Sequence, residues 1–194
     1  IVKNLSTPKT EDAIVKLLNE SSKSVDVITI DDFNKKKSTL RRILSASAGA
    51  IDGVIAIGDD DFPAHRGLVK NSERPIFLFY KGDLSLLSAK SKNIAVIGLL
   101  NPTQEIEISE RKLVSGLVEN GAVIVSGLAV GCDSIAHLQA LDSKGKTIAI
   151  LPSPLNDIMP AKNKDLAEDI VVSGGLLISE YLTAPRSKME LSGR

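Results

Sequence analysis

From Ile51 onward, short apolar runs of strand length alternate with amphipathic segments of helix length. The apolar runs are rich in Ile and Val and lie at 51–58, 75–80, 93–98, 122–127, 146–152 and 175–181. The last four runs are almost entirely apolar, which is typical of strands that are buried on both faces of a parallel sheet. The segments between these four lie at 103–121, 133–145 and 161–175, and each ends on glycine. This alternation predicts an α/β fold with a Rossmann-like, doubly wound and mostly parallel sheet.

The first part of the chain follows another pattern and is predicted to be a small, mostly helical segment, residues 1–50, ahead of a core at 51–194. Ser6 or Thr7, before Pro8, is a capping signal for a first helix. Residues 24–30, "SVDVITI", are a weak candidate for a strand. Residues 35–48, "KKKSTLRRILSASA", predict a second helix whose basic start opposes the helix dipole.

Composition narrows the possible partners. Lys plus Arg and Asp plus Glu both number 24, so a nucleic-acid partner would need a local positive patch. Aromatic residues make up only 3%, with no Trp, which leaves few platforms on which bases could stack. One Cys and two His argue against a disulfide framework, a metal site or a cofactor built on them. No apolar run approaches the ~20 residues that span a bilayer, and no signal peptide is visible, so a cytoplasmic protein is predicted.

Ligands of open α/β sheets bind at the carboxyl ends of the strands, which directs attention to the loops that follow them. One such loop opens the stretch "SGLAVGCDSIAHLQAL", residues 126–141. Gly127 and Gly131 allow close approach of the backbone, and exposed N–H groups of such a loop can bind an anion. The spacing matches neither the dinucleotide-binding pattern nor the phosphate-binding P-loop. A structural turn and an anion cradle therefore both remain open on spacing alone.

Asp133 and His137 lie at the start of the following helix. Asp133 is placed to cap the N–H groups of Ile135 or Ala136, an interaction worth roughly 1 kcal/mol. His137 lies one turn later, but no G-x-S-x-G nucleophile elbow accompanies the pair. An adjacent carboxylate raises the pKa of a thiol, which argues against Cys132 as a nucleophile. Structural roles are predicted for these residues, and no catalytic residue is assigned.

Several segments, in their order and spacing, resemble the DprA/Smf family of bacterial DNA-processing proteins. They are "DDDFP", "RPIFLFYKGDLSLL", "NIAVIG", "GAVIVSGLAVGCDSIAHLQAL", "GKTIAILPSPLNDIMPAKNKDL" and "SGGLLISEY", and the similarity covers Ile51 to Arg194. The resemblance implies a Rossmann-like domain that binds single-stranded DNA, protects it and helps load the RecA recombinase during natural transformation. Members of the family act as homodimers and are not known as enzymes. The first fifty residues resemble no family.

The resemblance also assigns a site. Incoming phosphates are expected at the strand ends, with Asp133 and His137 as structural members of the motif. The expected DNA or phosphate ligands are Gly98, Ser126, Gly127, Gly131, Lys162, Asn163, Lys188 and Arg194. The family's closing element, K-x-x-F-x-x-R-N-R, would begin at Lys188 and reach its first arginine at Arg194, the last residue. The core is therefore expected to be incomplete at its C-terminus.

Three departures from the family pattern predict a divergent member with weaker affinity. The family usually has G-[ST]-R after the strand at 93–98, and its arginine is a principal DNA contact, whereas this chain has Gly98, Leu99 and Leu100. Leu191 replaces an aromatic residue of the closing element, and Met159 replaces the tyrosine of a Tyr-Pro pair. Backbone N–H groups at Gly98 and Gly127 could still hold a phosphate, since they require no side chain.

Two other functions compete with DNA binding. Rossmann-like phosphoribohydrolases act on nucleoside monophosphates, but their P-G-G-x-G-T-x-x-E motif is absent, and the glycines of "SGGLLISE" precede a strand. A module that dimerises or contacts a recombinase without binding DNA is the second alternative.

Overall fold

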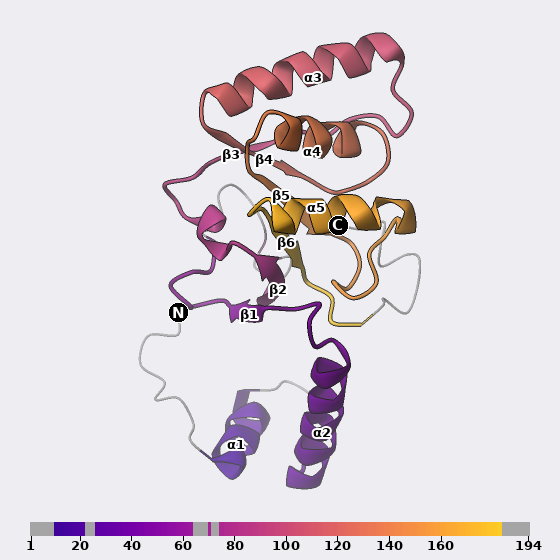
Figure 1. The fold of residues 1–194 in the computed structure, drawn as a ribbon. Helices are drawn as coiled ribbons and strands as arrows, with labels where there is room; N and C mark the ends of the chain where they lie inside the picture. The colour runs from indigo at the N-terminus through magenta and orange to yellow at the C-terminus, as the bar shows by residue number, and fades with distance from the viewer. Residues whose placement is uncertain (1–9, 22–25, 64–69, 71–73, 184–194) are drawn as a thin grey trace. The chain divides into compact units, whose positions relative to one another are not determined.

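The computed structural model describes residues 10–21, 26–63, 70 and 74–183 (Figure 1), and the chain divides into two compact units between Ala46 and Ser47. The first unit contains helices α1 (Glu11–Ser21) and α2 (Ile30–Ala46). Thr10 caps α1, because its Oγ1 accepts a hydrogen bond from the N–H of Ala13 at 3.3 Å. The predicted caps, at residues 6 and 7, lie outside the described residues.

Helix α2 begins earlier than the sequence pattern indicates. Thr29 and Asp32 cap each other's backbone, since the N–H of Asp32 donates to Thr29 Oγ1 at 3.1 Å and the N–H of Thr29 donates to Asp32 Oδ2 at 3.2 Å. The prediction of a strand at 24–30 is wrong for 26–30, the part of it that the structure describes, because residues 26–29 form no strand and Ile30 already belongs to the helix. The predicted basic start is also wrong, since Asp31 and Asp32 occupy the first turn and favour the helix dipole.

The second unit is a six-stranded mixed sheet with the order β1-β2-β6-β5-β4-β3. Its strands are β1 (Gly53–Ala56), β2 (Phe77–Gly82), β3 (Lys92–Ala95), β4 (Ala122–Ser126), β5 (Thr147–Leu151) and β6 (Leu176–Ser179). Its helices are α3 (Gln104–Glu119), α4 (Cys132–Asp142) and α5 (Lys164–Val172), with short 3-10 turns η2 (Leu84–Leu87) and η3 (Ala161–Asn163). Strands β3 to β6 run parallel, whereas β2 is antiparallel to both of its neighbours. The predicted Rossmann-like α/β fold is confirmed, and each strand and helix overlaps its predicted run, although β2 ends two residues later and β3 and α4 each begin one residue earlier than predicted.

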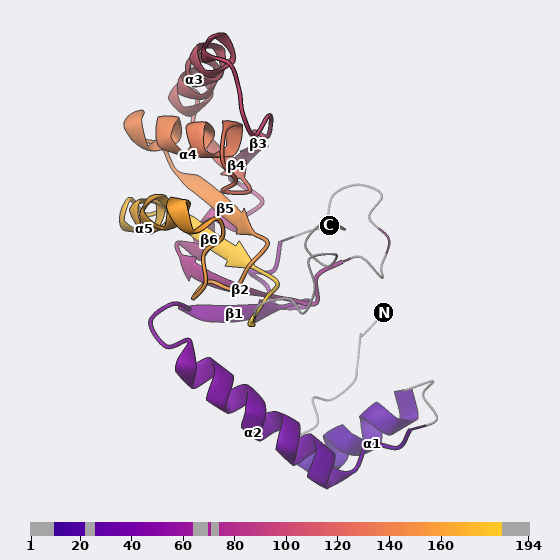
Figure 2. The same ribbon diagram turned by 90° about the vertical axis from the view of Figure 1, so that its right-hand side faces the viewer.

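The four parallel strands follow one another across the sheet in chain order, joined by α3, α4 and α5. Right-handed crossovers that step in one direction place their helices on one face of a sheet. Figure 2 shows α3, α4 and α5 together on the same side of the strands. The ends of β3, β4 and β5, and hence the loops that lead into these helices, consequently lie along one edge.

Burial follows this arrangement. Beneath the helices, Ile124, Ala136 and Ala140 pack with Val114 of α3, while a second cluster around Leu151 and Ile170 lies under α5. On the other face, Leu86 of η2 covers Ile148, Leu176 and Ile178. Strand β3 departs from the prediction of burial on both faces, because all four of its residues are exposed. It lies at the end of the strand order, and α3 packs mainly against α4 and β4 instead.

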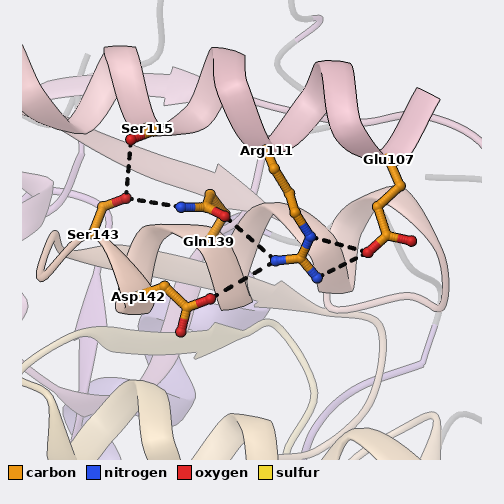
Figure 3. Close-up of polar contacts among 6 residues, drawn as sticks. All are labelled: Glu107, Arg111, Ser115, Gln139, Asp142 and Ser143. Carbon is orange, nitrogen blue, oxygen red and sulfur yellow. Dashed lines mark hydrogen bonds and ion pairs between the residues drawn. The ribbon is translucent and has the colours of Figure 1, made fainter. Parts of the chain in front are cut away.

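A polar network joins α3 to α4 (Figure 3). Arg111 Nε donates to Glu107 Oε1 at 3.0 Å and Nη2 lies 2.9 Å from the same oxygen, so two N–H groups converge on one carboxylate oxygen in this i,i+4 pair. Its Nη1 reaches Gln139 Oε1 at 3.4 Å and Asp142 Oδ2 at 3.8 Å on α4. Gln139 in turn donates to Ser143 Oγ at 3.0 Å. These contacts help to hold α4 in register with α3, and so help to fix where α4 begins at the strand ends.

Candidate functional site

The loops after β3, β4 and β5 are tied to one another by hydrogen bonds. Ser126 Oγ donates to the carbonyl of Val96 at 2.7 Å, and the N–H of Cys132 donates to the carbonyl of Leu99 at 2.9 Å. Ser126 is 3% exposed, so its hydroxyl group serves this internal bond and does not face solvent. The loop after β3 is therefore fixed to both the end of β4 and the start of α4.

The carboxylate of Asp133 lies inside the loop that precedes it. Its Oδ2 accepts hydrogen bonds from the N–H groups of Gly127 at 3.1 Å and Ala129 at 3.2 Å. The predicted cap to Ile135 or Ala136 is wrong, since Gly131 occupies the N-cap position and its carbonyl accepts the N–H of Ile135 at 3.0 Å. The loop does form a cradle for an anion, but the protein's own carboxylate already fills it at Gly127.

A positive φ angle at Leu128 explains how the loop reaches this shape. Leu128 has φ 59°, which is uncommon for a residue with a side chain, and it is fully buried in the cluster under α5. Packing of its side chain in the core offsets the strain of this backbone conformation. The turn directs the N–H groups of residues 127 and 129 toward Asp133.

Gly131 and Gly98 permit close packing. Gly131 has φ +79°, and a Cβ atom there would lie 2.2 Å from the carbonyl oxygen of Leu99. A Cβ atom at Gly98 would lie 2.7 Å from Cys132 Sγ. Both glycines are therefore required where the loop after β3 meets the start of α4. Gly98 remains exposed, and its N–H has no hydrogen-bond partner among the described residues.

Asn163 ties the third loop to the second. Its side chain is 7% exposed, and Nδ2 donates to the carbonyls of Leu128 at 2.8 Å and Ala129 at 3.2 Å and approaches Ser134 Oγ at 2.9 Å. The amide group expected to bind phosphate is thus engaged within the protein. Lys162, next to Asn163, is exposed, as is Lys164 at the start of α5, so two cationic side chains lie beside these hydrogen bonds.

His137 is completely buried, and its Nδ1 lies 2.7 Å from Thr147 Oγ1. The hydroxyl group of Thr147 donates to the carbonyl of Ile124 at 2.9 Å, so its oxygen accepts and the hydrogen of the imidazole resides on Nδ1. Burial lowers the pKa of His137 to about 4, which keeps the ring neutral at physiological pH. Asp133 and His137 bond in different directions and form no catalytic pair.

Cys132 is buried beside Glu110, and the contact with this carboxylate, followed by burial itself, raises the pKa of the thiol. The sequence reasoning attributed this effect to Asp133, which contributes less. Glu110 is 9% exposed, and apart from the thiol its oxygens have no hydrogen-bond partner among the described residues. Its position four residues before the buried Val114 on α3 was the available signal for this burial.

Other candidate groups are few at this edge. Ile97, Leu99 and Leu100 are 77%, 55% and 60% exposed, so apolar side chains occupy the loop where the resemblance would place an arginine. Lys188 and Arg194 lie outside the described residues. Within the described ranges, His, Cys, Asp and Glu side chains form no group of three that could hold a metal ion. In that same part of the chain, no helix has the length and apolar character needed to cross a membrane.

Comparison with known proteins gives one consistent result. The family model of DNA recombination-mediator protein A matches residues 53–191. The DNA processing protein DprA of Streptococcus pneumoniae is 41% identical over 126 residues, which cover 65% of this chain and 43% of that protein. The residues aligned in this comparison therefore cover less than half the length of this curated relative.

Two solved structures are similar in fold. The X-ray structure of DprA from Streptococcus pneumoniae has a TM-score of 0.64 and 33% sequence identity, covering 84% of this chain and 56% of that one. The structure of DprA from Helicobacter pylori, described for its single-stranded DNA binding mode, has a TM-score of 0.57 and 31% identity over 71% of this chain and 60% of that one. The family model, the curated relatives and the solved structures agree with one another. The chain belongs to the DNA recombination-mediator protein A family, the DprA/Smf proteins.

Proposed function

We propose that this chain binds single-stranded DNA as a recombination mediator, protecting incoming strands during natural transformation and assisting the loading of RecA onto them. The observation that carries the proposal is the family match over residues 53–191, which includes every described strand-end loop. The chemistry of these loops is compatible with binding rather than catalysis, because the Cys132 thiol has a raised pKa and the His137 ring is buried. Action as a homodimer in the cytoplasm is part of the same proposal.

The geometry restricts how a phosphate could be held. Gly127 donates its N–H to Asp133, and the polar groups of Ser126 and Asn163 bond within the protein. We therefore assign these residues, with Gly131, to the shape of the site, and the phosphate contacts to Lys162 and the exposed backbone at Gly98. Lys188 and Arg194 remain proposed contacts outside the described residues.

A nucleotide-hydrolysing function has less support. Gly174 and Gly175 follow the end of α5 and precede β6, so they terminate a helix instead of presenting N–H groups at a helix start. The N–H of Gly175 donates to the carbonyl of Ile170 at 2.8 Å, as expected for a helix C-terminus. No phosphate cradle is formed by these glycines.

A salt titration tests DNA binding. The chain is titrated against a fluorescent oligo-dT strand at increasing salt, and the log–log slope should be about 0.7 for each phosphate neutralised. Lys162→Gln should reduce this slope by about 0.7 and weaken binding to all base sequences alike, because a phosphate contact reads no bases. Lys112→Gln on the exposed side of α3 removes the same charge and should leave binding unchanged.

Absence of binding by the unmodified chain at low salt would reject the proposal, and a changed base preference in Lys162→Gln would reject that residue's role. Protection is measured as slower nuclease digestion of the bound strand. Assistance to RecA is measured as faster assembly of the recombinase on DNA when the chain is present.

A further inference from the structure

Helix α2 concentrates positive charge in a chain whose net charge is zero. Residues 33–46 contain no acid, and their cations are Lys35, Lys36, Lys37, Arg41 and Arg42. Lys37 is paired with Glu11 of α1. The other four are exposed, and we refer to Lys35, Lys36, Arg41 and Arg42 as the α2 basic surface.

The charges of this surface are largely uncompensated. Lys36, Arg41 and Arg42 have no hydrogen bond or ion pair with any described residue. Lys35 lies near Asp32, whose pKa is lowered first by its hydrogen bonds with Thr29 and, last among the causes, by the charge of Lys35. Among the acids near α2, Asp32 is hydrogen-bonded to Thr29 and Glu11 is paired with Lys37, while Asp31 lies in the first turn, four residues before Lys35.

The cations are not required for packing. None of the residues of α2 is fully buried, and Lys37, which pairs with Glu11 of α1, is half-buried, as is Phe33 one turn earlier. Lys35 and Arg42 are seven residues apart, so they lie on one side of the helix about 10 Å apart along its axis. At 3.6 residues per turn, Lys36 and Arg41 point about 110° away from this line on opposite sides of the helix. Lys35 and Arg42 therefore offer two charges in line to an extended chain of phosphates, and Lys36 and Arg41 add positive charge on either side.

We propose that the α2 basic surface is a second phosphate-binding site, which takes the backbone of single-stranded nucleic acid without reading its bases. This inference rests on the proposed function and adds a binding element in the first unit. The strand ends present few described cations, Lys162 and Lys164, beside the apolar Leu99 and Leu100. A neutral protein that binds a polyanion needs a local patch, and α2 supplies the densest described run of exposed cations.

The chemistry of α2 favours phosphates over lipid. Its exposed large apolar side chains are Leu40 and Leu44, at 48% and 39%, and the chain contains no Trp to anchor a helix at a membrane interface. Two adjacent arginines also suit phosphate, because the guanidinium group donates paired hydrogen bonds to its oxygens.

The test compares charge-matched variants of the full chain by salt titration with oligo-dT. Arg41→Gln/Arg42→Gln should weaken binding roughly three- to tenfold at low salt and reduce the slope by about 1.4, since two phosphates are lost. Lys90→Gln/Lys112→Gln removes the same charge from exposed positions of the second unit and should change neither quantity. Arg41→Lys/Arg42→Lys should restore most of the binding, and circular dichroism should show equal helix content in all variants.

Unchanged binding by Arg41→Gln/Arg42→Gln, while the wild type binds DNA, overturns this inference and leaves the proposed function standing. An equal loss in both neutralised variants also overturns it, because the effect would then come from overall charge. Failure of the wild type to bind DNA rejects both. If Arg41→Gln/Arg42→Gln lost binding to phosphatidylserine vesicles while its DNA binding stayed unchanged, the surface would be assigned to membranes instead.

Discussion

Asp133 keeps a negative charge at the strand ends, where a polyanion is proposed to approach. Its carboxylate holds the N–H groups of Gly127 and Ala129, so the charge is fixed in place. Sequence reasoning located this residue at the start of a helix correctly, but it chose the wrong hydrogen-bond partners. The choice depends on the positive φ of Leu128, a backbone conformation that residue type does not reveal.

Asp133→Asn should therefore raise the affinity for single-stranded DNA. The amide oxygen can still accept both N–H groups, while the negative charge is lost, so we expect a gain of roughly two- to fivefold at low salt that shrinks as salt screens the charge. Fluorescence anisotropy at two salt concentrations measures the change. Asp169→Asn, on the exposed side of α5, is the matched control and should show no gain.

His137 makes the stability of the fold depend on pH. Its pKa falls from 6.5 to about 4 on folding, so the unfolded chain takes up the proton first as pH is lowered. The stability that the buried neutral ring contributes to the fold is present above pH 6.5 and is lost as pH falls toward 4. The total loss is about 3 kcal/mol. Urea unfolding of the wild type and of His137→Gln should show a stability difference that narrows over this range. A difference that is constant with pH would contradict the assignment.

At the scale of elements, the period of apolar residues was sufficient to locate the strands and helices of the second unit. This period did not predict the structure of residues 26–30. There Thr29 and Asp32 form a capping box, so a β-branched run becomes the start of a helix. The period also failed for the burial of β3, because strand order decides which apolar strand lies at an edge. The motif indicated the ends of the strands as the site, whereas the hydrogen bonds of Ser126 and Asn163 arise only from tertiary packing.

Two glycines on neighbouring elements should respond oppositely to the same substitution. Gly131→Ala places a methyl group against the carbonyls of Leu99 and Leu100 at a positive φ, so it should destabilise the fold by more than about 1 kcal/mol. Gly116→Ala lies within α3 with nothing within 4 Å of the added atom, and should stabilise by about 0.5–1 kcal/mol. Thermal unfolding measures both, and a stable Gly131→Ala would show that the loop after β3 can move away.

At the scale of the whole molecule, charge and topology are distributed in ways that composition conceals. A net charge of zero arises from a cationic stretch in α2 and acids elsewhere, so the overall sum does not predict where a polyanion would be held. The sheet of the second unit winds from β3 to β6 in a single direction, which aligns the loops after β3, β4 and β5. The helical and strand periods of the sequence predict which segments form helices and strands. The order of the strands in the sheet is seen only in the folded structure.

The exposed strand β3 also affects how binding curves should be interpreted. Within the described residues it pairs with β4 on one side only, and Ile94 is 38% exposed. An unpaired edge is a template on which another strand can assemble as protein concentration rises. If the apparent cooperativity of DNA binding rises with the total protein concentration of the assay, it therefore reports edge-to-edge association between copies. Apparent cooperativity that stays the same on dilution would report interaction along the nucleic acid.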